Sequence, residues 1–207
     1  MTARFFARRR EFITLIGGAA ALLVPSAARA QKPEPVGSVT DIEGEAFAEA
    51  RAERRRLQQA APCFINDVVA TAQNSRLTLR LGRDTTLRLG QEARLTIDRY
   101  LVDAGGEITL QSGPILFDRP ARSTPSRLSI RSPFALISVR GTRFFAGPSA
   151  GSFGVFVERG SVVVSAAGKS VQLGSGQGTN ITHPGAAPSP PAPWGAERVR
   201  SALARVR

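Results

Sequence analysis

The sequence predicts an all-β fold, a roll or solenoid-like stack of short antiparallel strands, over residues 37–182. Leucine and isoleucine take every second position in 76–81, 87–89 and 94–98. Such alternation places one face of each strand in a core and the other in water. Turns that contain glycine separate these runs at short, even spacing. With hydrophobic residues at 42% and charged residues at 21% of the 207 residues, the chain has the composition of a packed domain.

The remaining strands follow in chain order between turn-forming residues. Short runs rich in Val, Ile, Leu and Phe are typical of strands, and they occur at 108–110, 115–117, 128–130, 136–139, 153–157, 162–164 and 171–173. Residues 45–59 leave an alternative open, because alanines and Glu–Arg pairs favour a helix there. We expect a strand from Gly44 to Ala50 instead, since a helix through Phe47 would have little apolar face to bury.

The first thirty residues have the organisation of an export signal. Arginines precede a short apolar run, which ends in small residues at the positions that a signal peptidase reads. The residues that carry this signal are Arg9, Arg10, Ala28 and Ala30. We expect cleavage after Ala30, which leaves residues 31–36 as a short leader. The arginine pair is of the twin-arginine type, which directs a folded protein across the inner membrane. The predicted location is therefore the bacterial periplasm or the outside of the cell.

The net charge and the scarcity of cysteine and histidine limit the functions that the chain can have. The chain has 28 Lys and Arg against 16 Asp and Glu, a net charge of +12. Five arginines and one glutamate lie in residues 1–30, so the exported chain keeps 23 basic and 15 acidic residues, or +8. This charge favours anionic glycans or lipid head groups by long-range attraction, and no nucleic acid is expected as a partner. One cysteine and one histidine exclude an internal disulfide and predict no metal site, no cofactor and no histidine catalysis.

The C-terminal part changes composition. Residues 183–195 contain five prolines and are expected to be an extended linker. Residues 196–207 are a basic tail in which apolar residues recur at helical spacing, namely Val199, Ala202, Leu203 and Val206. So short a helix needs a surface on which to fold. Two interpretations stay open: a frayed tail, and a peripheral contact with anionic lipid or a partner protein.

The strand region, taken in order, resembles the FecR domain. Its run from Asp67 is similar to the family's D-x-V-x-T-x-x-x-S, and residues 132–144 are similar to T-P-x-A-x-x-x-V-R-G-T-x-F. Thr85 stands where the family has the glycine of an Asp-Gly turn. The residues that carry the resemblance, with structural roles, are Asp67, Thr71, Ser75, Asp84, Arg140, Gly141 and Thr142.

The resemblance implies a roll of short strands. Signalling regulators of this family also have a cytoplasmic sigma-factor-binding segment, a membrane-spanning helix and a C-terminal subdomain that contacts a receptor. We expect none of these three parts here. For the sigma-factor-binding segment the reason is size, because only about ten residues precede the apolar signal core, too few to form a domain. Regulation of transcription is therefore not the expected function.

Several residues have chemistry that could form a site. Arg140 could bind an anion, but we expect it to pair with an internal acid such as Asp67 or Asp84, with Gly141 relieving a bulge. Cys63 is expected to be buried and inert, and His183 to be exposed. Glycan hydrolysis needs two carboxylates, and the candidates, each expected to be solvated, are Asp98, Asp103, Glu107 and Asp118.

The function expected from these observations is binding without catalysis. The chain would be a periplasmic domain that binds or scaffolds an envelope glycan, peptide or protein through an exposed strand face and its loops. Two alternatives stay open: an accessory sensor in cell-surface signalling, and a secreted glycan hydrolase that uses a pair of carboxylates.

Overall fold

The computed structural model describes residues 34–51, 53–101, 105–120 and 127–207. The chain divides into two compact units, Met1–Lys32 and Pro33–Arg207, and all described residues belong to the second. Outside the described residues lie Asp103, the first part of the leader 31–36, and the export-signal residues Arg9, Arg10, Ala28 and Ala30.

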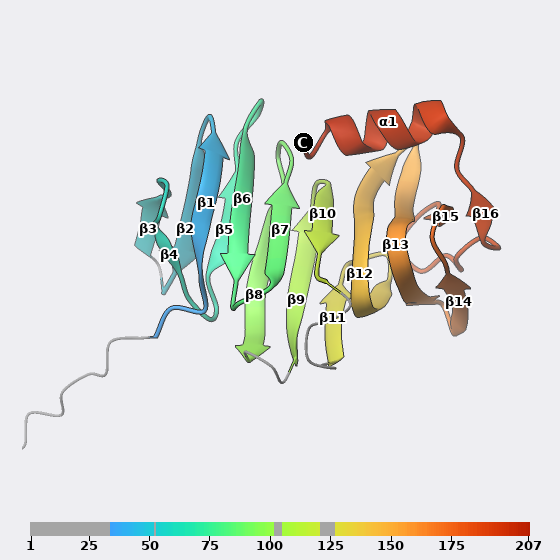
Figure 1. The fold of residues 1–207 in the computed structure, drawn as a ribbon, viewed down its shortest axis with the longest axis horizontal. Helices are drawn as coiled ribbons and strands as arrows, with labels where there is room; N and C mark the ends of the chain where they lie inside the picture. Colours follow the sequence, from blue (N-terminus) through green and yellow to red (C-terminus); the bar gives the residue numbers. More distant parts are fainter. Residues whose placement is uncertain (1–33, 52, 102–104, 121–126) are drawn as a thin grey trace, which may run out of the picture. The chain divides into compact units, whose positions relative to one another are not determined.

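The described part of the chain is mostly β-strand with one short helix, so the predicted all-β fold is confirmed (Figure 1). Each of the predicted apolar runs lies within a strand. The strand expected from Gly44 to Ala50 begins two residues later, at Ala46, and the helix considered for residues 45–59 is wrong. The helix is α1 (Ala196–Ala204), and the strands are β1 (Gly37–Glu43), β2 (Ala46–Ala50), β3 (Glu53–Arg56), β4 (Pro62–Cys63), β5 (Val68–Thr71), β6 (Arg76–Leu81), β7 (Thr85–Leu89), β8 (Arg94–Leu101), β9 (Gly105–Ser112), β10 (Ile115–Asp118), β11 (Arg127–Arg131), β12 (Leu136–Ser149), β13 (Ser152–Ala166), β14 (Lys169–Leu173), β15 (Gln177–Ile181) and β16 (Ala192–Pro193).

The strands form one sheet that folds back on itself into two layers. One layer has the order β3-β2-β5-β8-β9-β11, and the other has the order β4-β1-β6-β7-β10. Strand β12 joins them, because its first half pairs with β11 and its second half with β10. One pairing departs from the antiparallel expectation: β11 runs parallel to β9. The reason is that the chain passes through β10, in the other layer, between these two strands.

The layers enclose a single core. The inward positions of the alternating strands are filled almost entirely by Leu, Ile, Val and Phe, and cluster members such as Leu79 and Leu87 in one layer and Leu95 and Ile108 in the other are fully buried. The intervening polar residues face outward, as the period-two pattern requires. Burial of this shared apolar face is what holds the two layers together.

The long hairpin β12–β13 changes layer at two glycines. Gly141 has φ +58° and Gly160 has φ +86°, both in the left-handed region that favours glycine. A methyl group at Gly160 would lie 2.7 Å from the carbonyl oxygen of Gly141. The register shifts on both sides of Arg143, which marks bulges in the ladder. Close approach of two backbones therefore lets one hairpin turn from one layer into the other.

The C-terminal segment packs on the outer side of the β10-containing layer. Figure 1 shows α1 lying across β12 and β13. The predicted apolar stripe is confirmed as the buried face of the helix, and it packs with Leu116, Phe145 and Phe156 of the sheet. Residues 196–204 are therefore a docked helix and not a frayed tail. The apolar stripe is not available for a peripheral contact with anionic lipid or a partner protein, because the chain's own sheet covers it. Residues 183–195 are also bonded to the sheet, through β16 and Ser189.

Trp194 anchors this segment in a slot between two glycines. A methyl group at Gly154 would lie 2.6 Å from Cη2 of the indole, and one at Gly178 would overlap its Nε1. The indole stacks on Phe156 with ring centroids 5.2 Å apart, and the Arg198 guanidinium lies 3.7 Å above it. The missing side chains on β13 and β15 thus admit the ring against the backbone.

Replacing Gly178 by alanine should displace Trp194 and weaken docking of α1. We expect the free energy of unfolding to fall by about 1–3 kcal/mol, the usual cost of overpacking, with a red shift of Trp emission because Trp194 is the chain's single tryptophan. Urea denaturation followed by fluorescence measures both. Gly174→Ala is the matched control, since its methyl group would meet its nearest atom only at 3.4 Å. Equal stability of the two variants would contradict the slot.

Candidate interaction surfaces

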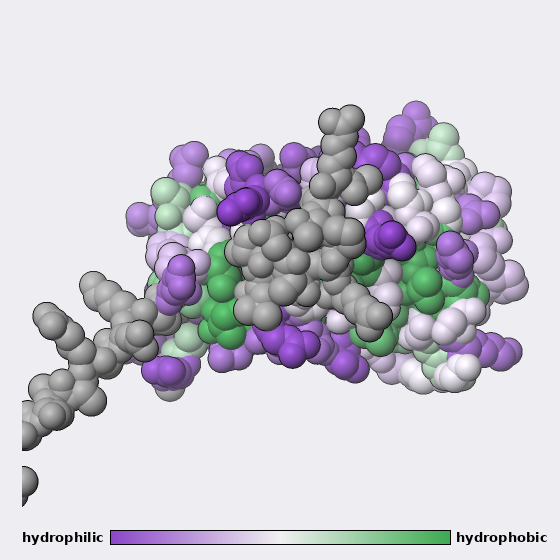
Figure 2. Space-filling model, turned by 60° about the horizontal axis from the view of Figure 1, so that its bottom comes forward, coloured by the Kyte–Doolittle hydropathy of each residue, from purple (hydrophilic) through white to green (hydrophobic). Residues whose placement is uncertain are grey.

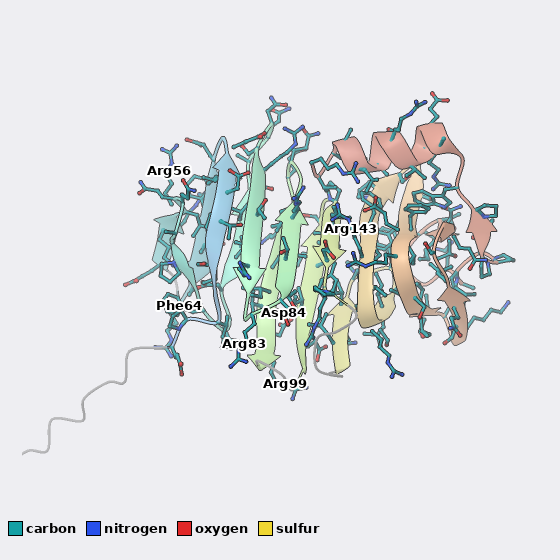
Figure 3. All side chains as sticks on the ribbon, in the orientation of Figure 1. Arg56, Phe64, Arg83, Asp84, Arg99 and Arg143 are labelled. Carbon is teal, nitrogen blue, oxygen red and sulfur yellow. The ribbon has the colours of Figure 1, made fainter. Side chains whose placement is uncertain are left out.

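Three turns of the FecR-like motif, here called its corners, are each held by a buried polar side chain, and Asp67 holds the first. Its side chain is fully buried, and Oδ2 accepts the backbone N–H of Phe64 at 2.8 Å and a hydrogen bond from the Arg55 guanidinium. Arg55 also donates to the carbonyl of Pro62 and lies over the Phe64 ring, which Figure 3 labels. Asp67 therefore holds the turn before β5 and the edge strand β3 together.

Thr71 and Ser75 fasten the next two corners. The Thr71 hydroxyl donates to the carbonyl of Gly90 at 2.6 Å and accepts the N–H of Ala93 at 3.0 Å. Ser75 Oγ accepts the N–H of Glu45 at 2.9 Å. Both side chains are buried, and each of these hydrogen bonds satisfies a backbone group of a neighbouring turn. The four-residue spacing of the motif places one such polar group at each corner.

The Arg140–Gly141–Thr142 motif lies at the layer-changing bend. Thr142 is buried, and its carbonyl accepts the N–H of Arg119 at 2.9 Å. Arg140 is exposed and makes no ion pair with a described carboxylate, so the expected pairing with Asp67 or Asp84 is wrong. Arg55 takes the Asp67 carboxylate instead, and Asp84 is exposed at the end of the β6–β7 hairpin (Figure 3).

Arg143, three residues after Arg140, binds two partly buried carboxylates. Its Nη1 donates to Asp118 at 2.8 Å and its Nε to Glu158 at 2.6 Å. Burial lowers the pKa of Arg143, but the hydrogen bonds and charges of Glu158 and Asp118 outweigh burial, so the net direction is upward. Arg159 and Arg207 bind the outer oxygens of the same carboxylates. This network ties the end of the C-terminal segment to β10, β12 and β13.

No helix among the described residues lies on the opposite outer face of the β12–β13 hairpin. Here the first half of β12 and the second half of β13 lie between β11 and β14, and a row of outward residues runs across them in register: Ser129, Ser138, Val163 and Gln172. A groove of about 650 Å³ lies over these strands, with Leu136 and Arg140 also in its lining. Val163 is 38% exposed. Figure 2 shows hydrophobic surface bordered by hydrophilic residues on the side of the molecule that holds these strands.

The other candidate residues lie in separate places. Glu107 pairs with Arg131, and Asp118 pairs with Arg143 and Arg159. Asp98 forms no ion pair with a described arginine or lysine. Cys63 is fully buried, and burial, followed by the charge of Asp67 and opposed by Arg55, raises its pKa to about 11. His183 is exposed, and its Nδ1 contacts only the carbonyl of Pro184.

The sequence alone does not identify the residues that make one outer face of the β12–β13 hairpin a docking surface for α1 and the other a groove. Neither Trp194 nor the slot of Gly154 and Gly178 was expected, although a glycine inside an apolar strand run is a signal for close backbone approach. The groove has no local signal, because its residues come from strands that meet only in the folded sheet. No helix in the described part of the chain is long and apolar enough to cross a membrane.

Replacing Asp67 by asparagine should destabilise the domain. The change leaves Arg55 without its partner, and we expect a loss of about 2–3 kcal/mol, below the cost at a fully buried pair because the Arg55 side chain is 34% exposed. Chemical denaturation measures the loss. Asp41→Asn, an exposed carboxylate on β1, is the control and should change stability by less than about 0.5 kcal/mol. Equal effects of the two changes would contradict the role given to Asp67.

The Cys63 thiol should be protected in the folded protein. At pH 8 we expect Ellman's reagent to react slowly until urea unfolds the chain, because burial keeps the thiol protonated and covered. The pKa is higher in the folded chain than its ordinary value of 9.0, so the thiolate forms first in the unfolded chain. Stability should therefore fall as pH rises from about 9 to about 11. Complete reaction of the native protein within minutes would contradict this environment.

Comparison with known proteins identifies a matching family model and two solved structures of similar fold. The family model FecR protein matches residues 67–163. Two solved structures, each of a protein assigned as an anti-sigma factor from Parabacteroides distasonis ATCC 8503, are similar, with 14% and 13% identity and TM-scores of 0.54 and 0.55. The alignments cover 66% of this chain and 64% and 63% of those chains.

This chain therefore spans less than two thirds of those proteins, and at such identity the likeness concerns the fold alone. Comparison with the curated proteins gives no match. The matched residues begin at the Asp67 corner and end in the second half of β13, so they include every motif corner and the layer-changing bend. Residues 67–163 of this chain are a FecR domain.

Proposed function

We propose that this chain is a non-catalytic binding domain of the bacterial envelope, exported by the signal in residues 1–30, which holds an acidic segment of an envelope protein on the groove face. The groove face is the outer side of β11, β14, the first half of β12 and the second half of β13. One observation carries the proposal: the two outer faces of a single hairpin differ, because α1 covers one and the other is uncovered by any described residue.

The chemistry of the groove face suits a polypeptide. Its lining alternates small hydroxyl side chains with Leu136 and Val163, and the described lining contains no aromatic ring on which a sugar could stack. Arg140 lies in the lining without a described carboxylate partner, so it can bind an acidic side chain. The exported chain's net charge of +8, from 23 basic and 15 acidic residues, attracts an acidic partner over longer range.

The FecR domain supports a role in cell-surface signalling without catalysis. The hydrolase alternative is not favoured, because Glu107 and Asp118 are each engaged by arginines. A sensor that docks on a membrane through residues 196–207 is not favoured either, since Ala202, Leu203 and Val206 already pack on the sheet.

Site-specific photocrosslinking in intact cells tests this function. A crosslinking amino acid at Ser138, on the groove face, should give one discrete protein adduct whose captured segment, sequenced by mass spectrometry, is acidic. The same group at Thr78, on the outer side of β6, is the control and should not give that adduct. Arg140→Glu should reduce the Ser138 adduct at least about tenfold, since it replaces attraction by repulsion. An adduct that survives this change, or that appears equally from Thr78, would overturn the proposal.

A further inference from the structure

We propose that the acidic segment binds by adding a strand to the free edge of β14, so that main-chain hydrogen bonds, and not side-chain contacts alone, hold it. The inference rests on the proposed function and specifies how the partner is bound. The observation behind it is that β14 pairs with β13 and with no other described strand. Its other edge adjoins the groove, whose lining includes Gln172.

The hairpin geometry shows which main-chain groups are free. β13 and β14 are joined by a two-residue turn, Ala167 and Gly168, both with positive φ, and Ala166 faces Lys169 across it. In such hairpins the residues that flank the turn exchange hydrogen bonds, and bonded pairs then alternate along the ladder. Val171 and Leu173 therefore bond to β13. The N–H and C=O groups of Ser170 and Gln172 point away from β13, toward the free edge.

The other edges of the sheet are protected in ways that β14 is not. β3, at the far end of the same layer, has the sequence Glu-Arg-Arg-Arg, and its arginines pair with Glu49, Asp67 and Glu45. β4 and β16 have only two residues each. Charge and shortness are the usual means of preventing strand addition. β14 has five residues and a single charge, Lys169, at its start.

An added strand would also extend the core. Val171 is only partly buried, although it packs against the buried cluster between the layers. Alternate side chains of an added strand would face the same way as Val171 and cover it. The remaining side chains would continue the row of Ser138, Val163 and Gln172 on the groove face. The segment that fits is thus extended and alternating, with apolar residues on one side and acidic or hydroxyl residues on the other.

A partner of different sequence suits this edge better than a second copy of the chain. Two exported copies would each bring the same excess of positive charge, 23 basic against 15 acidic residues. Like charges disfavour that pairing, whereas an acidic segment meets Lys169 at the edge and Arg140 in the groove.

Binding of a defined probe tests the inference. The probe is a fluorescent nine-residue peptide that alternates Val with Glu and Thr, and its affinity for the full exported chain is measured by fluorescence anisotropy. Gln172→Pro removes the edge N–H without removing a bond to β13, and it should weaken binding about tenfold or more. Gln172→Ala loses the same side chain but keeps the N–H, so it should bind the peptide at least about tenfold more tightly than Gln172→Pro does. Methylation of alternate backbone nitrogens of the peptide should abolish its binding to the unchanged protein, which provides a test independent of any variant's folding.

The outcomes separate the inference from the proposed function. Binding that is lost in Arg140→Glu but kept in Gln172→Pro and with the methylated peptide would overturn strand addition and leave the groove as the site. Absence of binding by the unchanged protein, or binding of a Lys peptide as tight as that of the Glu peptide, would overturn both. A dimer seen by sedimentation and lost in Gln172→Pro would make a second copy the occupant and overturn the acidic segment.

Discussion

Both layers of the molecule depend on one bend in the hairpin β12–β13. At Gly141 and Gly160 the two backbones approach more closely than side chains would allow. Before the bend β12 pairs with β11, and after it with β10, so one hairpin completes both layers around a single core. Because the hairpin has an outer side in each layer, the bend also creates two outer faces that can differ in chemistry.

The two faces do differ, and this difference underlies the proposed function. One presents Leu116, Phe145 and Phe156, an apolar surface that would be unfavourable in water, and the chain covers it with Trp194 and α1. The other presents serines, Val163 and Arg140, which water tolerates, and it ends at the edge strand β14. The C-terminal segment thus protects the face that would otherwise aggregate and leaves the polar one open.

Local patterns predicted the strands because each short run shows the alternation of apolar and polar residues by itself. They predicted the apolar stripe of residues 196–207 because its helical spacing is likewise visible within one short segment. They could not show which surface the stripe covers, since Phe145 and Phe156 meet it only in the folded sheet. The error at Arg140 has a similar origin. A bulge separates Arg140 from Arg143, and only the ladder reveals that Arg143 faces Asp118 and Glu158. The sequence shows which residues are charged, but only the folded structure shows which charged residues pair with each other.

Amide hydrogen exchange measured by NMR tests the central claim, that α1 covers one outer face whereas no described residue covers the other or pairs with the outer edge of β14. Unbonded amides exchange quickly, and those in stable ladders or docked helices exchange slowly. The structure predicts alternation along β14, slow at Val171 and Leu173 and fast at Ser170 and Gln172, together with protection in the second half of α1. Uniform exchange along β14, or an unprotected α1, would contradict it.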